Sequence, residues 1–143
     1  MTTLLIGYGN PGRGDDGLGP AFAERIAALG LPGLVVEVDY QLTVEHALPI
    51  SQADTVIFAD AALDAETPFY LRPLTGEASQ IGSHSLTPDA ALNLARTLFN
   101  AAPQGYTLGL QGRDYGEVSE GLSPVAEASL AAAEAFFLSW YRP

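Results

Sequence analysis

Short apolar segments alternate with segments of helical spacing along the chain, and this alternation constrains the fold more than any other feature. Apolar runs that end in a glycine or an aspartate are typical of buried parallel strands. The expected strands are Thr3–Gly7, Leu34–Asp39, Thr55–Asp60, Tyr106–Leu110 and a short edge strand, Phe69–Leu71. Strands that alternate with helices predict an α/β fold with helices on both faces of the sheet. We therefore expect one three-layer α/β/α domain over residues 1–143, with a mostly parallel, twisted sheet of about five strands.

Helix-starting signals stand between these strands. Thr87 and Ser123 are each followed by proline, the pattern of an N-cap with proline at the first helical position. Thr43 is a candidate N-cap for a shorter helix. The expected helices are 18–29, 44 to about 48, 88 to about 100 and 124 to about 141.

Composition limits the classes of function. The 143 residues include 6 Lys and Arg against 17 Asp and Glu, a net charge of −11. Such a charge disfavours nucleic acid and anionic membrane, because both bind basic surfaces. There are no cysteines, which excludes disulfides, thiolate zinc sites and thiol nucleophiles. With no signal-peptide pattern and no long apolar stretch, we expect a cytoplasmic protein that binds neither nucleic acid nor membrane. We also expect a monomer, but no sequence feature bears on the oligomeric state, which stays open.

The loop after the first strand, GYGNPGRGDDGLG, has two interpretations. Gly7–Gly12 match the G-x-G-x-x-G dinucleotide fingerprint, and Asp39 ends the second strand as that interpretation requires. However, proline and glycine residues delay the helix, and Asp15 and Asp16 then occupy the helix end that a pyrophosphate needs. The carboxylates favour a cation over a nucleotide.

A cation site needs further ligands, and two candidates follow. In parallel sheets, ligands bind beyond the carboxyl ends of the strands, so Asp16 and Asp60 share one crevice if the first and third strands are neighbours. His84, in the small polar loop GSHS, is a candidate third ligand. His46, within TVEHAL, is a weaker candidate, and we do not expect it to bind metal. Two carboxylates and an imidazole suit nickel, zinc or cobalt, with positions open for metal-assisted hydrolysis.

These residues together resemble the hydrogenase maturation endopeptidase family, whose members remove a short C-terminal extension from the large-subunit precursor of nickel–iron hydrogenases. The segments that carry the resemblance are GYGNPGRGDDGLG, TVIFADAA, IGSHSLTP and GLSPVAEA, which span nearly the whole chain. The resemblance implies a phosphorylase/hydrolase-like fold, with Asp16, Asp60 and His84 as catalytic metal ligands. It also implies that nickel arrives in the precursor, that zinc or cadmium can substitute, and that no nucleotide is bound. The metal either positions the scissile region or activates water.

A departure from the family pattern concerns the substrate cleft. Many members follow the second strand with an Asp-Gly-Gly-Thr-like loop, whereas this chain keeps only Asp39 and Thr43 of it. Asn10, Asp15, Asp39 and Thr43 are the expected cleft residues. The hydrogenase class, the cleavage position, the peptide length and the roles of Asp15 and His46 stay open.

Two other functions share some of these features. A non-catalytic chaperone that binds metal or precursor could use the same fold and the same ligands. Peptidyl-tRNA hydrolases also begin with a strand and a G-x-G-N-P-G loop, but they need a histidine soon after it. Here no histidine precedes His46, and the net charge opposes tRNA binding.

Overall fold

The computed structural model describes residues 1–76, 86–116 and 120–143, in which five strands and four α-helices form one α/β domain. The strands are β1 (Thr3–Tyr8), β2 (Leu34–Asp39), β3 (Thr55–Ala62), β4 (Phe69–Pro73) and β5 (Gln104–Gln111). The helices are α1 (Leu18–Ala27), α2 (Ala47–Ser51), α3 (Pro88–Phe99) and α4 (Pro124–Trp140). Two 3-10 turns, η1 (Gly14–Gly17) and η2 (Val44–His46), directly precede α1 and α2.

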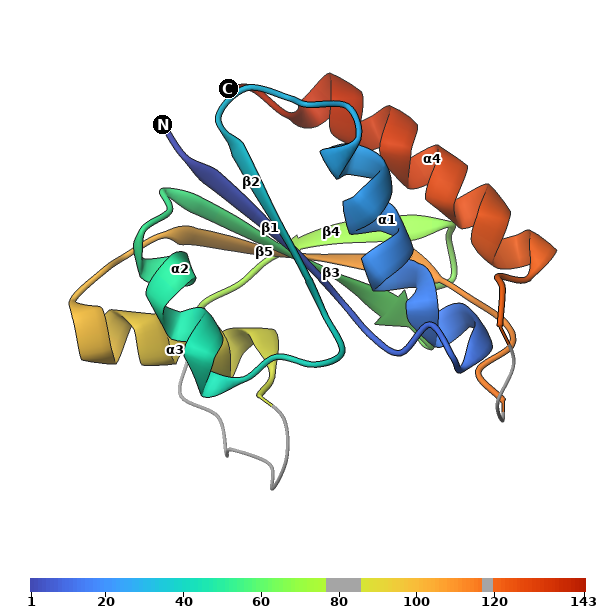
Figure 1. Ribbon diagram of the computed structural model, residues 1–143, viewed down its shortest axis with the longest axis horizontal. Coiled ribbons are helices and arrows are strands. Elements are labelled where there is room, and N and C mark those ends of the chain that lie inside the picture. Colours follow the sequence, from blue (N-terminus) through green and yellow to red (C-terminus); the bar gives the residue numbers. More distant parts are fainter. Residues whose placement is uncertain (77–85, 117–119) are drawn as a thin grey trace.

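The sheet has the order β2-β1-β3-β5-β4. All neighbouring strands are parallel except β4, which runs antiparallel to β5 at one edge. Helices α1 and α4 cover one face of the sheet, and α2 and α3 cover the other (Figure 1). The predicted three-layer fold and the edge position of β4 are therefore confirmed. β1 and β3 are neighbours, which is the condition under which Asp16 and Asp60 share one crevice.

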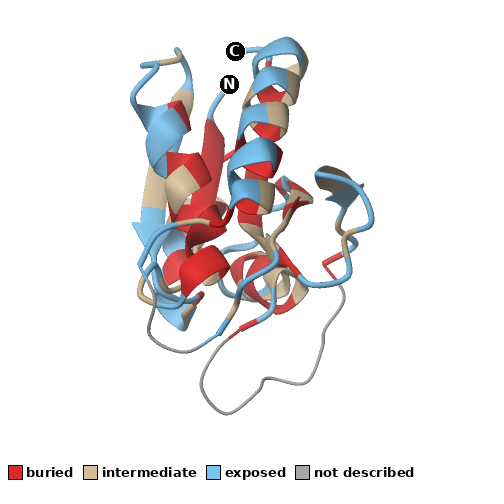
Figure 2. Ribbon diagram, turned by 90° about the vertical axis from the view of Figure 1, so that its right-hand side faces the viewer, coloured by how far each residue is buried: buried red, intermediate tan, exposed pale blue. Residues whose placement is uncertain are grey.

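Two buried clusters hold the layers together, one on each face of the sheet. Phe22 of α1 and Phe137 of α4 meet edge to face on the first side, with ring centroids 5.8 Å apart. Phe58 of β3 and Leu92 of α3 belong to the buried cluster on the second side. The inward face of α4 is buried and its outer face exposed, as the burial pattern in Figure 2 shows. The predicted caps are present too, since Thr87 and Ser123 each accept a hydrogen bond from a backbone N–H in the first turn.

The end of β3 differs from the sequence prediction. Asp60 was expected to close this strand, but Ala61 and Ala62 continue it and pair with Leu110 and Gln111 of β5. The strand is longer because Leu110 and Gln111, at the end of β5, offer backbone partners for two more positions. Asp60 therefore lies within a paired strand, which fixes the direction of its side chain.

The first turn of α1 packs unusually closely on the ends of two strands. A Cβ on Gly19 would lie 2.4 Å from the carbonyl oxygen of Tyr8 and 2.5 Å from that of Ala59. Glycine is required there because the helix backbone rests directly on β1 and β3. Among the described residues, no helix is long and apolar enough to cross a membrane.

Candidate functional site

The loop between β1 and α1 positions the carboxylate of Asp16. Gly9 turns the chain with φ of 144°, a backbone conformation that favours glycine. The N–H of Asn10 then donates a 2.8 Å hydrogen bond to Oδ2 of Asp16, and Oδ1 of Asn10 accepts one from Gly12. Asp16 lies in η1 before α1, half-buried, with its carboxylate held toward the strand ends.

Asp60 lies close enough to Asp16 for the two carboxylates to interact. The pKa of Asp60 is raised to about 6, mainly by burial and in smaller part by the negative charge of Asp16, while hydrogen bonding with Ala61 and Tyr8 limits the increase. Like charges in one site raise each other's pKa unless a cation lies between them. The structure therefore brings these two predicted ligands together at the carboxyl ends of β1 and β3.

Three tyrosines interact electrostatically with Asp60, and the sequence interpretation missed them. Tyr8 interacts with the Asp60 carboxylate, and burial followed by this interaction raises the pKa of Tyr8. Asp60 also adds to the raised pKa values of Tyr70 and Tyr115, behind burial in both cases. The ring of Tyr70 lies against Gly109, where a Cβ would meet the ring at 2.3 Å. Of the three, only Tyr8 forms a hydrogen bond with Asp60, whereas the Tyr70 hydroxyl donates to Asp64.

Asp15 has a different position from its neighbour Asp16, since it is fully buried. Its Oδ2 accepts hydrogen bonds from the N–H groups of Arg113 and Asp114 at 2.7 and 2.9 Å and from Oγ of Ser123 at 2.5 Å. Its Oδ1 accepts from the N–H of Ser123 at 2.8 Å. Burial alone would raise the pKa of Asp15, but these bonds outweigh it and lower the pKa. Asp15 thus joins the η1 loop to the loop before α4 and does not reach the surface.

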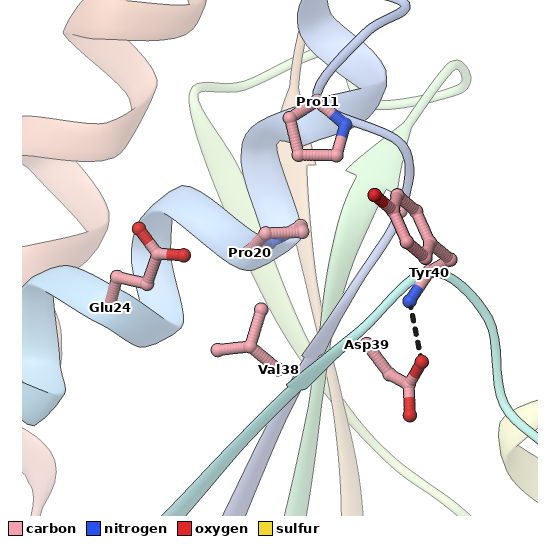
Figure 3. Close-up of a pocket in the computed structure, with 7 residues that line it drawn as sticks. Pro11, Pro20, Glu24, Val38, Asp39 and Tyr40 are labelled. Carbon is pink, nitrogen blue, oxygen red and sulfur yellow. Dashed lines mark hydrogen bonds between the residues drawn. The ribbon is translucent and has the colours of Figure 1, made fainter.

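A pocket of about 280 Å³ opens where β2 ends, beside the loop that carries Asp16. Its walls include Pro11 of that loop, Pro20 and Glu24 of α1, and Val38 and Tyr40 (Figure 3). Tyr40 is 70% exposed and Val38 is 43% exposed. The pocket is therefore an open apolar surface with a carboxylate at its side.

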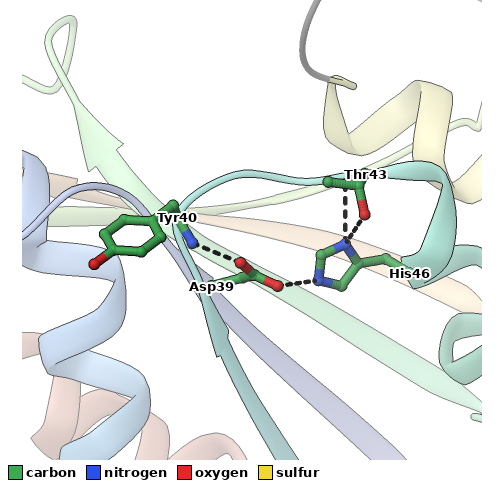
Figure 4. Close-up of polar contacts among 4 residues, drawn as sticks. All are labelled: Asp39, Tyr40, Thr43 and His46. Carbon is green, nitrogen blue, oxygen red and sulfur yellow. Dashed lines mark hydrogen bonds and ion pairs between the residues drawn. The ribbon is translucent and has the colours of Figure 1, made fainter.

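Asp39 and Thr43, both predicted cleft residues, are connected through His46. The N–H of Thr43 donates to Nδ1 of His46 at 3.0 Å, so that Nε2 carries the proton and faces Oδ2 of Asp39 at 3.5 Å (Figure 4). His46 is buried, whereas the Asp39 side chain is half-exposed and points toward this ring. The predicted Thr43 cap is present, and the His46 ring holds the Asp39 carboxylate on its side of the loop.

His84, the third predicted ligand, lies outside the described residues. Among residues 1–76, 86–116 and 120–143, no group of three His, Cys, Asp or Glu side chains could hold a metal ion. The two carboxylates at the strand ends are thus the part of the predicted ligand set that the structure places.

The comparisons with solved structures define the class of fold: it is that of the hydrogenase maturation endopeptidases. The endopeptidase HybD from E. coli superposes with a TM-score of 0.74 and 20% sequence identity, over 97% of this chain and 93% of that chain. The maturation protease HycI from Thermococcus kodakarensis superposes with a TM-score of 0.73 and 20% identity, over 94% and 89%. HybD from the same organism superposes with a TM-score of 0.71 and 17% sequence identity, over 99% of this chain and 100% of that chain. No protein-family model and no curated protein matches the sequence. The resemblance noted in the sequence is confirmed at the level of the fold.

Proposed function

We propose that the protein is an endopeptidase that removes a C-terminal extension from the large-subunit precursor of a nickel–iron hydrogenase. Nickel in this proposal belongs to the substrate: the precursor brings it, and Asp16, Asp60 and His84 bind it during recognition. The observation that carries the proposal is the approach of Asp16 and Asp60 at adjacent strand ends of a fold shared with maturation proteases.

The electrostatics of the acid pair support a cation as the group that is recognised. Asp60 has a raised pKa of about 6 partly because Asp16 is negative, so a divalent ion would relieve repulsion that the free protein carries. A site of oxygen and imidazole ligands without thiolates binds nickel, zinc or cadmium exchangeably. This property suits a metal that arrives with the substrate and leaves with the product.

The surrounding groups of the chain would orient the two carboxylates. The Asn10 N–H fixes one oxygen of Asp16, which leaves the other oxygen for a ligand. Tyr8 and the Ala61 amide act in the same way on Asp60. Carboxylates held in one orientation bind a metal with less loss of side-chain entropy than free ones.

The dinucleotide alternative has little support in the loop geometry. A pyrophosphate binds to the N-terminus of the helix that follows the glycine loop. Here that first turn rests on the carbonyl oxygens of Tyr8 and Ala59, so closely that a Cβ on Gly19 would lie 2.4 and 2.5 Å from them. The Asp16 carboxylate also occupies the entrance to this turn and repels anions.

The test is cleavage of the precursor, followed by intact-mass measurement. Nickel-loaded precursor should lose its C-terminal extension, and nickel-free precursor should keep it. Asp16→Asn and Asp60→Asn should each reduce the rate by at least a hundredfold, as removal of a charged group at the reacting centre commonly does. Asp54→Asn is the matched control, because Asp54 is an exposed carboxylate before the amino end of β3.

Two results would contradict the proposal in separable ways. A stable complex with the precursor but no change in its mass would favour the chaperone function. Undiminished cleavage by His84→Ala would remove His84 from the ligand set and leave the rest of the proposal standing.

A further inference from the structure

The outer edge of β2 has unpaired backbone groups. β2 is the last strand on its side of the sheet, and in the described part of the chain no strand pairs with its outer edge. The N–H groups of Thr3 and Gly9 donate to the carbonyls of Gly33 and Asp39, so the odd-numbered residues of β2 face β1. The backbone groups of Leu34, Val36 and Val38 therefore point outward.

This edge lacks most of the features that usually protect edge strands. Soluble proteins commonly place proline, lysine or a bulge at such positions. β2 has the sequence LVVEVD and pairs with β1 without interruption from Leu34 to Asp39. Val35 and Val38 are 49% and 43% exposed. The charges on the strand, Glu37 and Asp39, are both negative, so they disfavour pairing with a second copy of the chain.

A pocket lies on each side of the β2 edge. The pocket of about 280 Å³ contains Val38 and Glu24 and opens on the side of α1. A smaller one of about 110 Å³ contains Val35 and Pro49 and opens on the side of α2. Val35 and Val38 are about 10 Å apart along an extended strand. Because side chains alternate between faces, residues three apart on an added strand would enter the two pockets.

We propose that the free edge of β2 binds an extended, basic segment of the protein substrate as an additional strand of the sheet. A lysine or arginine of this segment occupies the larger pocket, with its stem on the proline rings and its charge beside Glu24. A small apolar side chain three residues away occupies the smaller pocket. The inference rests on the proposed function for the identity of the substrate.

The position of the edge relative to the acid pair supports this occupant. The carboxyl end of β2 is joined to the loop after β1 by the hydrogen bond from the Gly9 N–H to the Asp39 carbonyl. The same loop carries Asp16. A peptide paired along β2 would therefore be led to the carboxyl edge of the sheet, where Asp16 and Asp60 lie. The carboxylates of Glu24 and Glu37 and the net charge of −11 complement a basic segment.

The backbone part of the proposal is tested with Val36→Pro. Proline at this position removes an outward N–H and leaves the β1-facing groups of its neighbours intact. The reference is Val36→Ala, which loses side-chain atoms but keeps the N–H. The ratio of the KM values of the two variants therefore reports the contribution of the backbone N–H alone. With nickel-loaded precursor as substrate, we expect KM to rise at least fivefold in Val36→Pro relative to Val36→Ala, with kcat changed less than twofold.

The charge part is tested with Glu24→Lys, a surface change that does not depend on the folding of the proline variant. Its matched control is Glu66→Lys, which makes the same change of charge on an exposed residue between β3 and β4. We expect Glu24→Lys to raise KM about tenfold and to weaken its dependence on salt. The KM of Glu66→Lys should stay within twofold of the wild-type value.

The outcomes separate this inference from the proposed function. If the wild type cleaves the precursor while Val36→Pro and Glu24→Lys match their controls in KM, the edge does not bind substrate and the inference is wrong. A dimer in light scattering that Val36→Pro dissociates would also overturn it, because the edge would then pair with a second copy. If the wild type does not cleave, the proposed function fails, and anisotropy titrations of labelled precursor against the same variants still decide whether the edge binds it.

Discussion

The adjacent carboxylates Asp15 and Asp16 should lose very different amounts of stability on the same substitution to asparagine. In Asp15→Asn, the amide oxygen can replace only one carboxylate oxygen. If it takes the place of Oδ2, it can accept from Arg113, Asp114 and Ser123 Oγ, and the amide NH₂ then faces the backbone N–H of Ser123. Two donors meet in a fully buried site, and the remaining bonds lose their charge assistance.

The magnitude follows from these contacts. An unsatisfied buried donor costs about 1–3 kcal/mol, and hydrogen bonds to a charged group are stronger than neutral ones by about 1 kcal/mol each. Because the bonds share one acceptor and do not add, we expect a total loss of about 3 kcal/mol. For a domain of this size that lowers Tm by roughly 10 °C. Asp16→Asn loses charge on a single bond to a half-buried group, so about 1 kcal/mol or less is expected.

The assay is urea unfolding followed by circular dichroism across pH. Because the folded pKa of Asp15 lies below its usual value of 3.8, its contribution is complete above that value and is lost as the pH falls through the folded pKa. The difference in free energy of unfolding between the wild type and Asp15→Asn should therefore be constant near neutral pH and shrink below about pH 4. If Asp15→Asn and Asp16→Asn are equally stable at pH 7, the assignment of Asp15 to the loop connection is refuted.

Three further outcomes are expected. In metal-free protein, folding raises the pKa of Asp60 from 3.8 to about 6, so the free energy of unfolding falls as the pH rises through that window. In the same urea assay, the free energy of unfolding of Asp60→Asn should exceed that of the wild type by about 1–2 kcal/mol at pH 7.5 and equal it at pH 4. Cadmium should raise the Tm of the wild type more at pH 7.5 than at pH 5, and not that of Asp60→Asn, by thermal shift. Gly19→Ala should lower the free energy of unfolding by about 3 kcal/mol, because the added Cβ clashes with two backbone oxygens. Gly116→Ala should leave it nearly unchanged, because the space beside Gly116 is open.

Much of the fold could be predicted because the signals are local. Apolar runs such as Leu34–Asp39 and cap-plus-proline pairs such as Ser123-Pro124 depend on a few neighbouring residues. The end of β3 could not be placed in this way. Ala61 and Ala62 are strand residues because β5 offers them partners, and that pairing joins segments about fifty residues apart.

The tyrosine beside Asp60 was within reach of sequence reasoning. Leu4, Ile6 and Tyr8 alternate along β1 and face the cluster on the side of α2 and α3. The same period of two carries Asp60 to that face of β3. With β1 and β3 as neighbours, the register that pairs Gly7 with Ala59 brings Tyr8 toward Asp60. The burial of Asp15 was not predictable, because its donors come from a loop about a hundred residues later in the chain.

The acid pair after the glycine loop combines two requirements that one residue could not meet. In the proposed function, the Asp16 carboxylate keeps free lone pairs for the metal and faces the substrate, so its loop needs another connection to the core. Asp15 supplies that connection, since its four bonds fix η1 against the segment before α4. Asp16, the next residue, is thereby positioned with only one bond of its own. We therefore expect substitution of Asp15 to lower the stability of the protein, and substitution of Asp16 to lower the proposed activity of a protein that stays folded.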